Sequence, residues 1–453
     1  MSIESTHPQY DQSAPRIQKM RDFYAGSDQV KSQGETYLPA PRSIAMLKED
    51  PRRSGRFLEA YEAYKSRAEV PEYVSDAIDK NVGMMHASPP SIDLPDALAG
   101  MLDDATGDGL GLADLLRNIN AEQLFSGRLG LALDARTGID YPVIRMYYAE
   151  DVRNWLFSDG QYQFVILGEQ EESISEYEWK VVPSRRVMEV IDGAYATTAF
   201  DNKGAIIREQ IEPEIRGKRL DIVPFVAINA ADIAPDIDKP PLLPLAEKCA
   251  SIYRLDADHK LNLHMQSAST LVIAGLAHNG DQHDGDGERK VMVGAGGFIE
   301  VDLGGSAQYA QPGAEGLTAQ QQALDAMHIQ AKNLGVDILG NAGAGESGDA
   351  MSVRVMARTA TLVQVASAGA AGLERILKIA AKWVGANPDQ VAVKPFTDFN
   401  VQSANPADAL ALAQIRNLGA PYSKRAYHWW LSKQRFTPFD YDEEMNEIEN
   451  EGP

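Results

Sequence analysis

A glycine-rich stretch at residues 340–348 comes nearest to a chemical motif in this sequence. It reads Gly-Asn-Ala-Gly-Ala-Gly-Glu-Ser-Gly, which nearly matches the phosphate-binding pattern G-x-x-x-x-G-K-[ST]. In that pattern a lysine contacts the β- and γ-phosphates of a nucleotide, whereas Glu346 would repel them here. The motif also requires a preceding strand, and this stretch follows a helical pattern. We therefore interpret residues 340–348 as a loop between two helices.

A second candidate is the acidic run at residues 281–288, whose carboxylates are of the type that binds calcium. The calcium-binding loop of the helix–loop–helix type needs a glycine at its sixth position, and Arg289 stands there if Asp284 is the first. We interpret the run as an exposed hairpin tip. His259 and His264 lie about 140° apart around a helix, so they do not share a metal-binding face. We expect no metal site.

Signatures of other enzyme classes are absent from the sequence, including the G-x-S-x-G nucleophile elbow and the H-E-x-x-H zinc motif. The adjacent Asp103 and Asp104 lie in a polar stretch that lacks the apolar surroundings needed to raise a carboxyl pKa. Cys249 is the sole cysteine, which excludes an internal disulfide, and it falls on the apolar side of a predicted helix. We expect a protein with no catalytic residues and no cofactor.

The composition is that of a folded protein with a strong acidic excess. Of the 453 residues, 44% are hydrophobic and 24% are charged, and the net charge is −22. Because basic side chains supply most of the affinity for phosphates, this charge makes any contact with DNA weak, local or non-adhesive. No apolar run approaches the roughly 18 residues of a membrane span, and polar residues follow Met1. We therefore expect synthesis in the cytoplasm and no membrane partner.

The first half of the chain changes from helical to strand-like patterns. Residues 1–50 are polar and irregular, which predicts an arm or a loosely docked segment. Apolar spacings of three and four predict helices from Gly55, from Pro71 and over residues 112–125. Strands are predicted at residues 129–134, 141–149, 155–157, 162–167, 187–191 and 223–228. This region therefore predicts a mixed or antiparallel sheet.

The second half is mainly helical. The patterns predict helices over residues 243–267, over 318–339 with a capping box at Thr318, and over 349–384, a length of about 54 Å. Gly369 and Gly372 favour a bend or close packing along neighbours, such as copies of the same chain. Further on, the patterns predict strands at 391–393 and 396–399, helices at 406–419 and 423–434, and a solvated acidic end at 440–451. The fold class is α+β.

Five groups of residues occur in a specific order along the chain: Tyr64–Ala68 with Pro89–Pro90, Ser126–Asp134, Tyr147–Trp155, Pro240–Ala246 and Ala381–Gly385. In their order and spacing they resemble the portal proteins of tailed bacteriophages, in a branch catalogued as a domain of unknown function. The resemblance runs from about Tyr64 to Glu449.

The resemblance implies a portal-type fold, with a mixed α/β wing, a two-helix stem, a small α/β clip and a long channel-side helix. Residues 1–54 would be an N-terminal arm, 55–239 the wing of helices and sheet, 240–268 the first stem helix, 269–316 the clip, 317–339 the second stem helix, 340–348 the tunnel loop, 349–385 the long wing helix, and 386–453 the C-terminal wing or short crown with an acidic tail.

The resemblance also implies a function. Such a protein forms a head-to-tail connector in the virion, a ring of about twelve subunits at one capsid vertex that is assembled in the host cytoplasm. Double-stranded DNA is packaged and later ejected through its channel. Its further partners are terminase, a head-completion or adaptor protein, and the major capsid or scaffolding protein. The alternatives are another ring-forming head–tail connector, or a cytoplasmic hydrolase or nucleotide-dependent motor subunit.

Two sets of residues are expected to carry these contacts. The DNA-channel set combines the loop with basic residues of the two stem helices: Lys332, Asn341, Gly343, Gly345, Glu346, Ser347, Arg254 and Lys260. The partner-binding set lies in the clip: Asn279, Asp281, Asp284, Asp286 and Phe298. The basic residues would make transient contacts with phosphates.

Overall fold

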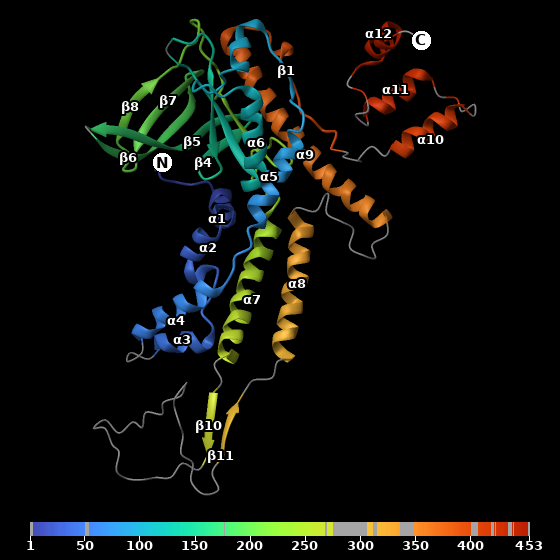
Figure 1. Ribbon diagram of the computed structural model, residues 1–453. Helices are drawn as coiled ribbons and strands as arrows, with labels where there is room; N and C mark the ends of the chain where they lie inside the picture. Colours follow the sequence, from blue (N-terminus) through green and yellow to red (C-terminus); the bar gives the residue numbers. More distant parts are fainter. Residues whose placement is uncertain are drawn as a thin grey trace. The chain divides into compact units, whose positions relative to one another are not determined.

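The structure is a computed structural model, and it describes most of the chain. The described residues are 3–49, 54–136, 138–175, 177–267, 270–274, 306–310, 315–335, 348–399, 406–417, 421, 423–433, 437 and 439–451. They belong to two compact units, Met1–Thr397 and Asp398–Pro453, each of which is described by itself (Figure 1). Helices and antiparallel strands occupy separate stretches of the chain, in agreement with the α+β class.

Two antiparallel sheets lie in the first unit. The smaller has the order β3-β2-β9 and consists of β2 (Arg128–Asp134), β3 (Val143–Tyr148) and β9 (Phe225–Asn229). The larger has the order β4-β5-β6-β7-β8 and consists of β4 (Val152–Ser158), β5 (Gln161–Ser175), β6 (Glu178–Ile191), β7 (Ala194–Asp201) and β8 (Ile206–Ile211). The sequence patterns missed β7, which is rich in Ala and Thr, and β8, which is exposed along its whole length.

Two helices pack on the smaller sheet, namely α6 (Leu112–Ser126) and the long α9 (Gly348–Val384). A Cβ atom at Gly372 of α9 would overlap the side chain of Ile228 on β9, and one at Gly369 would overlap Asn120 of α6. Because these two glycines lack a side chain, α6 and β9 of the same chain can pack closely against α9. The expectation that they pack against copies of the chain is wrong, because α6 and β9 already fill that space.

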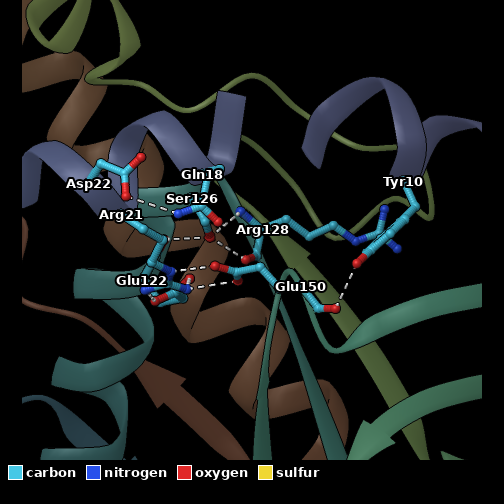
Figure 2. A network of polar contacts seen from close by, with 8 residues as sticks. All are labelled: Tyr10, Gln18, Arg21, Asp22, Glu122, Ser126, Arg128 and Glu150. Atoms are coloured by element: carbon cyan, nitrogen blue, oxygen red, sulfur yellow. Dashed lines mark hydrogen bonds and ion pairs between the residues drawn. The ribbon is translucent and has the colours of Figure 1, made fainter. Parts of the chain in front are cut away.

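The N-terminal segment is not irregular. Residues Pro8–Ala25 form α1, which buries Ile17, Met20 and Phe23. Figure 2 shows how Arg21 of α1 lies between two carboxylates, with its Nη2 atom 2.6 Å from Oε1 of Glu122 and 2.9 Å from Oε2 of Glu150. The expectation of a loosely docked arm is therefore wrong for this helix, since α1 is held by both apolar burial and ion pairs.

Glu122 of α6 is the more buried of the two carboxylates that pair with Arg21. Burial raises its pKa to about 7, because the loss of water disfavours the charged form more than Arg21 favours it. Glu150 binds the same guanidinium, and its negative charge adds to the upward shift of the Glu122 pKa. Arg21 also lies 3.9 Å from the ring centre of Phe125. The docking of α1 therefore includes a group that titrates near neutral pH.

The first unit contains further helices and strands: α2 (Ser27–Ser32), α3 (Arg42–Glu49), α4 (Ser54–Arg67), α5 (Tyr73–Met85), α7 (Leu243–Ser267), α8 (Glu315–Gly335), and the antiparallel pairs β1 (Ser91–Asp93) with β12 (Ala392–Lys394) and β10 (Thr270–Ala274) with β11 (Ser306–Ala310). Those from residue 54 onward mostly follow the predicted pattern, whereas α2 and α3 show that the expectation of an irregular segment is wrong over these residues as well. Because α8 begins at Glu315, Thr318 lies inside the helix and the predicted capping box is wrong. Residues 396–399 are not a strand.

The second unit contains α10 (Pro406–Asn417), α11 (Lys424–Lys433) and α12 (Tyr441–Glu451). The acidic end of the chain is therefore helical over residues 441–451. Oδ1 of Asp440 accepts hydrogen bonds from the backbone N–H groups of Asp442 and Glu443, and Glu443 in turn accepts one from the N–H of Asp440. This reciprocal cap begins the helix, and its negative charges are favourable at a helix N-terminus.

Candidate nucleic-acid interface

An antiparallel pair of helices, α7 and α8, carries the three basic residues that were expected to contact DNA (Figure 1). Proline at the second residue of α7, Pro244, suits the first turn of a helix. Three contacts fix the register: Nζ of Lys248 donates to Oε1 of Gln330 at 2.9 Å, Nδ2 of Asn262 donates to Oε1 of Gln320 at 3.3 Å, and Gly335 faces Leu245. The antiparallel β10–β11 pair follows α7 and precedes α8 along the chain.

The crossing of α7 and α8 is close because one position lacks a side chain. A Cβ atom at Gly335 would lie 2.5 Å from Cδ2 of Leu245 and 3.1 Å from Cβ of Ala77 on α5. Tyr73 of the same α5 places its hydroxyl 2.9 Å from Nδ1 of His328 on α8. His328 therefore has a structural partner, and three helices meet at this end of the pair.

The rest of α7 is covered by the N-terminal helices. The hydroxyl of Tyr64 on α4 donates to Oδ1 of Asp258 at 2.7 Å. Cys249 and Tyr253 are fully buried, and burial raises the pKa of the Cys249 thiol to about 12. A thiol with this pKa is a poor nucleophile, which agrees with the structural role expected for this residue.

Two of the basic residues expected at the DNA are occupied within the chain. Nε of Arg254 donates to the backbone oxygen of Tyr37 at 2.8 Å. Nζ of Lys260 lies 2.7 Å from Oε1 of Glu69 and 3.1 Å from Oδ2 of Asp256. Both side chains thus connect α7 to neighbouring segments. Their part in DNA contact stays a prediction, and these contacts do not favour it.

The third basic residue, Lys332 of α8, is exposed, and no ion pair of its ammonium occurs among the described residues. It lies on the side of α8 that faces away from α7, which we call the α8 outer face. The outer face consists of exposed or half-buried residues at helical spacing: Ala319, Gln322, Asp325, Ala326, Ile329, Lys332 and Asn333. It is nearly neutral, since Asp325 balances Lys332.

Small and amide side chains dominate the outer face, and sequence reasoning missed this property because it looked for basic residues. The signal was present in the recurrence of Ala or Gln at positions 319, 322 and 326, three and four residues apart. Ile329 on the same face is 61% exposed, which is unusual for a large apolar side chain. Among the described residues, no other helix or strand therefore covers the outer face.

The long helix α9 is anchored at its C-terminal half. Leu373, Ile376, Leu377 and Trp383 are fully buried, and Nε1 of Trp383 donates to the backbone oxygen of Lys218 at 3.1 Å. Side chains at residues 348–358 of this helix lie outside the described set. The core thus fixes one half of α9 against the smaller sheet.

Ten of the expected site residues fall outside the described residues. They are Asn279, Asp281, Asp284, Asp286, Phe298, Asn341, Gly343, Gly345, Glu346 and Ser347. Within the described part of the chain, no group of three or more His, Cys, Asp or Glu side chains is arranged to hold a metal ion. The helices described here include none that is long and apolar enough to cross a membrane.

Comparison with known proteins gives a family match and several structural matches. The family described as "Domain of unknown function (DUF4055)" matches residues 241–384, the stretch that contains α7, α8 and α9. No curated protein matches the sequence.

Three solved structures are similar over most of their length. One is from the neck of an empty gene transfer agent (GTA) particle computed with C6 symmetry, with 14% identity over 80% of this chain and 90% of that chain and a TM-score of 0.43. Another is from the virion of a native GTA particle, with 15% identity over 87% and 94% of the two chains and a TM-score of 0.41. The third is from the neck of a native GTA particle computed with C12 symmetry, with 15% identity over 79% and 89% and a TM-score of 0.40.

Proposed function

We propose that this chain is the portal subunit of a phage-type particle, one of about twelve copies in a ring through which double-stranded DNA enters and leaves a capsid. The ring would have no catalytic activity of its own. The proposal is supported by the order of the portal-like segments in the sequence and by the arrangement of α7, α8 and α9.

The observation that carries the proposal is the α8 outer face. The packed side of α8 is satisfied by α7 and α5, whereas the outer face exposes Ala, Gln and Ile329 to no described neighbour. In a ring this face would turn toward the opening. A nearly neutral surface of short side chains lets a polyanion pass without strong adhesion, since affinity for DNA comes mainly from clustered basic residues.

The charge of the whole chain fits the same role. A ring of about twelve chains, each with a net charge of −22, carries roughly −260 charges, which opposes non-specific adhesion of DNA. Lys332 would supply a transient contact with phosphate on an otherwise neutral face. Amide side chains such as Gln322 would add weak, sequence-independent hydrogen bonds.

The parts of the chain take their portal roles within this proposal. The pair α7 and α8 would form the stem, residues 269–316 the clip for terminase and the head-completion protein, and residues 340–348 the tunnel loop at the DNA. The sheets with α6 and α9 would form the wing that meets the capsid or scaffold. A ring assembled in the host cytoplasm would then reside in the virion.

Native mass spectrometry of the purified chain tests the proposal. We expect a closed assembly of about twelve copies whose mass does not depend on nucleotide. A single copy that turns over a nucleotide or an ester would contradict it and favour an enzyme. A closed assembly of a clearly different copy number would favour another connector.

A further inference from the structure

Three charged side chains converge above Gly168 of β5, on the larger sheet and away from α7 and α8. A Cβ atom at Gly168 would lie 2.9 Å from Nε of Arg153, 3.5 Å from its Nη2, and 3.3 Å from Oδ1 of Asp151. Arg185 of β6 is the register partner of Gly168, so its side chain leaves the same face of the sheet. The missing side chain at Gly168 thus makes room for the guanidinium group of Arg153 and the carboxylate of Asp151, with Arg185 beside them.

The guanidinium groups have more donors than partners. Nε of Arg153 and both Nε and Nη1 of Arg185 are buried, and they have no hydrogen-bond partner among the described residues. A buried donor without a partner destabilises the fold, and more so when it is charged. Three such donors at one place point to an acceptor that approaches both arginines.

The N-terminal segment lies along the edge of this place. The backbone N–H of His7 donates to the backbone oxygen of Arg153 at 2.9 Å, and Nδ2 of Asn154 donates to the backbone oxygen of Ser5 at 2.9 Å. These contacts limit the access of water to one side of the arginines. An anion there would be only partly screened, which strengthens its interaction with the two cations.

The charges around Arg185 and Asp151 also favour a bound anion. The pKa of Arg185 is lowered, first by burial and then by the neighbouring positive charge of Arg153, and the opposing effects of Glu4 and Tyr10 do not outweigh them. The pKa of Asp151 is raised, chiefly by burial and then by Glu150, although Arg153 acts to lower it. The positive charge of Arg185 is therefore undercompensated, and the carboxylate of Asp151 favours a partner that brings a proton.

We propose that Arg153, Arg185 and Asp151 form a binding site for the monohydrogen phosphate ion. A tetrahedral dianion matches two cations and offers acceptors for all three buried donors. Its one O–H group would donate to the carboxylate of Asp151. Sulfate and the phosphodiester of DNA lack that O–H group at neutral pH, so the carboxylate would repel them. The site is independent of the function proposed above.

Calorimetric titration of the full chain with inorganic phosphate at pH 7.5 tests this site, with sulfate, adenosine 5′-monophosphate and a short DNA duplex as parallel probes. We expect phosphate to bind at least tenfold more tightly than sulfate or the duplex. Adenosine 5′-monophosphate, whose phosphate group carries no O–H at this pH, should bind as weakly as sulfate, and binding as tight as that of phosphate would contradict the proposal. Equal binding of phosphate and sulfate would overturn the proposal.

Substitutions at the three residues test whether they bind the phosphate. Arg153→Gln and Arg185→Gln should each weaken phosphate binding at least tenfold, because each removes a charge-assisted contact. Arg208→Gln is the matched control, since Arg208 is an exposed arginine of the same sheet that pairs with Glu171. Asp151→Asn should remove the preference for phosphate over sulfate. Binding and the midpoint of thermal unfolding are measured on the same samples, so a variant that fails to fold is recognised. If the arginine variants do not fold, the loss of the phosphate preference in Asp151→Asn is the deciding result. Unchanged phosphate binding in both arginine variants would refute the site.

Discussion

Nζ of Lys260 lies 2.7 Å from Oε1 of Glu69, and this contact joins α7 to the segment that follows α4. Arg254 on the same helix is bonded to the backbone oxygen of Tyr37. The basic residues of α7 therefore serve the fold of one chain. Lys332, on the outer face of α8, is the basic residue of this pair of helices that is left for a contact outside it.

A charge reversal at Lys332 tests whether this residue contacts DNA. We expect Lys332→Glu to leave ring assembly unchanged and to alter the length or the retention of packaged DNA, because it adds repulsion at each copy of the outer face. Lys203→Glu, which makes the same charge change in an exposed turn between β7 and β8, should package as the unaltered protein does. Packaged DNA length per particle is the measurement. If the two variants behave alike, Lys332 does not face DNA.

Replacement of Lys260 is the complementary test. Lys260→Gln should lower the midpoint of thermal unfolding slightly, since its partner Glu69 is mostly exposed and exposed ion pairs contribute little. DNA packaging should not change. A packaging defect in Lys260→Gln with an unchanged unfolding midpoint would show that this side chain leaves Glu69 to meet DNA.

The stability of the chain should depend on pH through Glu122. Its pKa is about 7 in the folded chain, above the roughly 4.3 of an unfolded glutamate, so the folded chain binds the proton more tightly. The resulting stability is complete below the unfolded pKa and is lost as the pH rises through 7. We expect the difference in unfolding free energy between the unaltered chain and Glu122→Gln to change by on the order of 1–3 kcal/mol between about pH 5 and pH 8.

Denaturant titrations at several pH values measure this difference. Glu62→Gln is the control, because Glu62 is exposed and pairs with the nearby Lys65. Its difference from the unaltered chain should stay constant over the same range. An equal pH dependence for both variants would mean that Glu122 is ionised throughout, held so by Arg21.

Two glycines in helices should respond in opposite directions. Gly372→Ala should destabilise the chain by about 1–3 kcal/mol, because the new methyl group meets Ile228 in a packed core. Gly83→Ala in α5 should stabilise it by about 0.5–1 kcal/mol, since a Cβ there meets no atom within 4 Å. Chemical unfolding measures both. In an Ile228→Ala background, which has space for the new methyl group, Gly372→Ala should cost less than it does in the unaltered chain. A stabilising Gly372→Ala in the unaltered chain would place α9 farther from β9.

The buried thiol permits a labelling test of the α8 outer face. Cys249 is fully buried with a pKa of about 12, so we expect no reaction with a maleimide under native conditions. Ala326→Cys adds a thiol at an exposed position and should react rapidly. Ala331→Cys, at a buried position of the same helix, should react slowly and serves as the control. Equal reactivity of the two positions would show that α8 is turned differently.

Several elements were predictable because their patterns are regular. The bounds of α7 match the predicted 243–267, and α9 begins one residue before the predicted Asp349, since both have long apolar repeats and clear breaks before them. The strand β8 was not predictable, because all its residues are exposed and period-two burial is lost. The start of α8 was misplaced because Thr318 imitates a cap inside a helix.

The contacts that define the sites were harder to predict from the sequence. The sequence shows that Gly369 and Gly372 need close neighbours, but it does not say whether those belong to the same chain or to a copy. The pairing of Arg21 with Glu122 spans 101 positions, and no local pattern encodes such a partner. Likewise, the positive charge of Lys260 was visible in the sequence, whereas its engagement by Glu69 was not.

Electron cryo-microscopy of the purified assembly tests the central claim most directly, by locating the α8 outer face. We expect a ring with a central opening in which Ala326 and Lys332 line the inner wall. A particle without an opening, or a ring in which these two residues lie on the outer surface, would contradict the account.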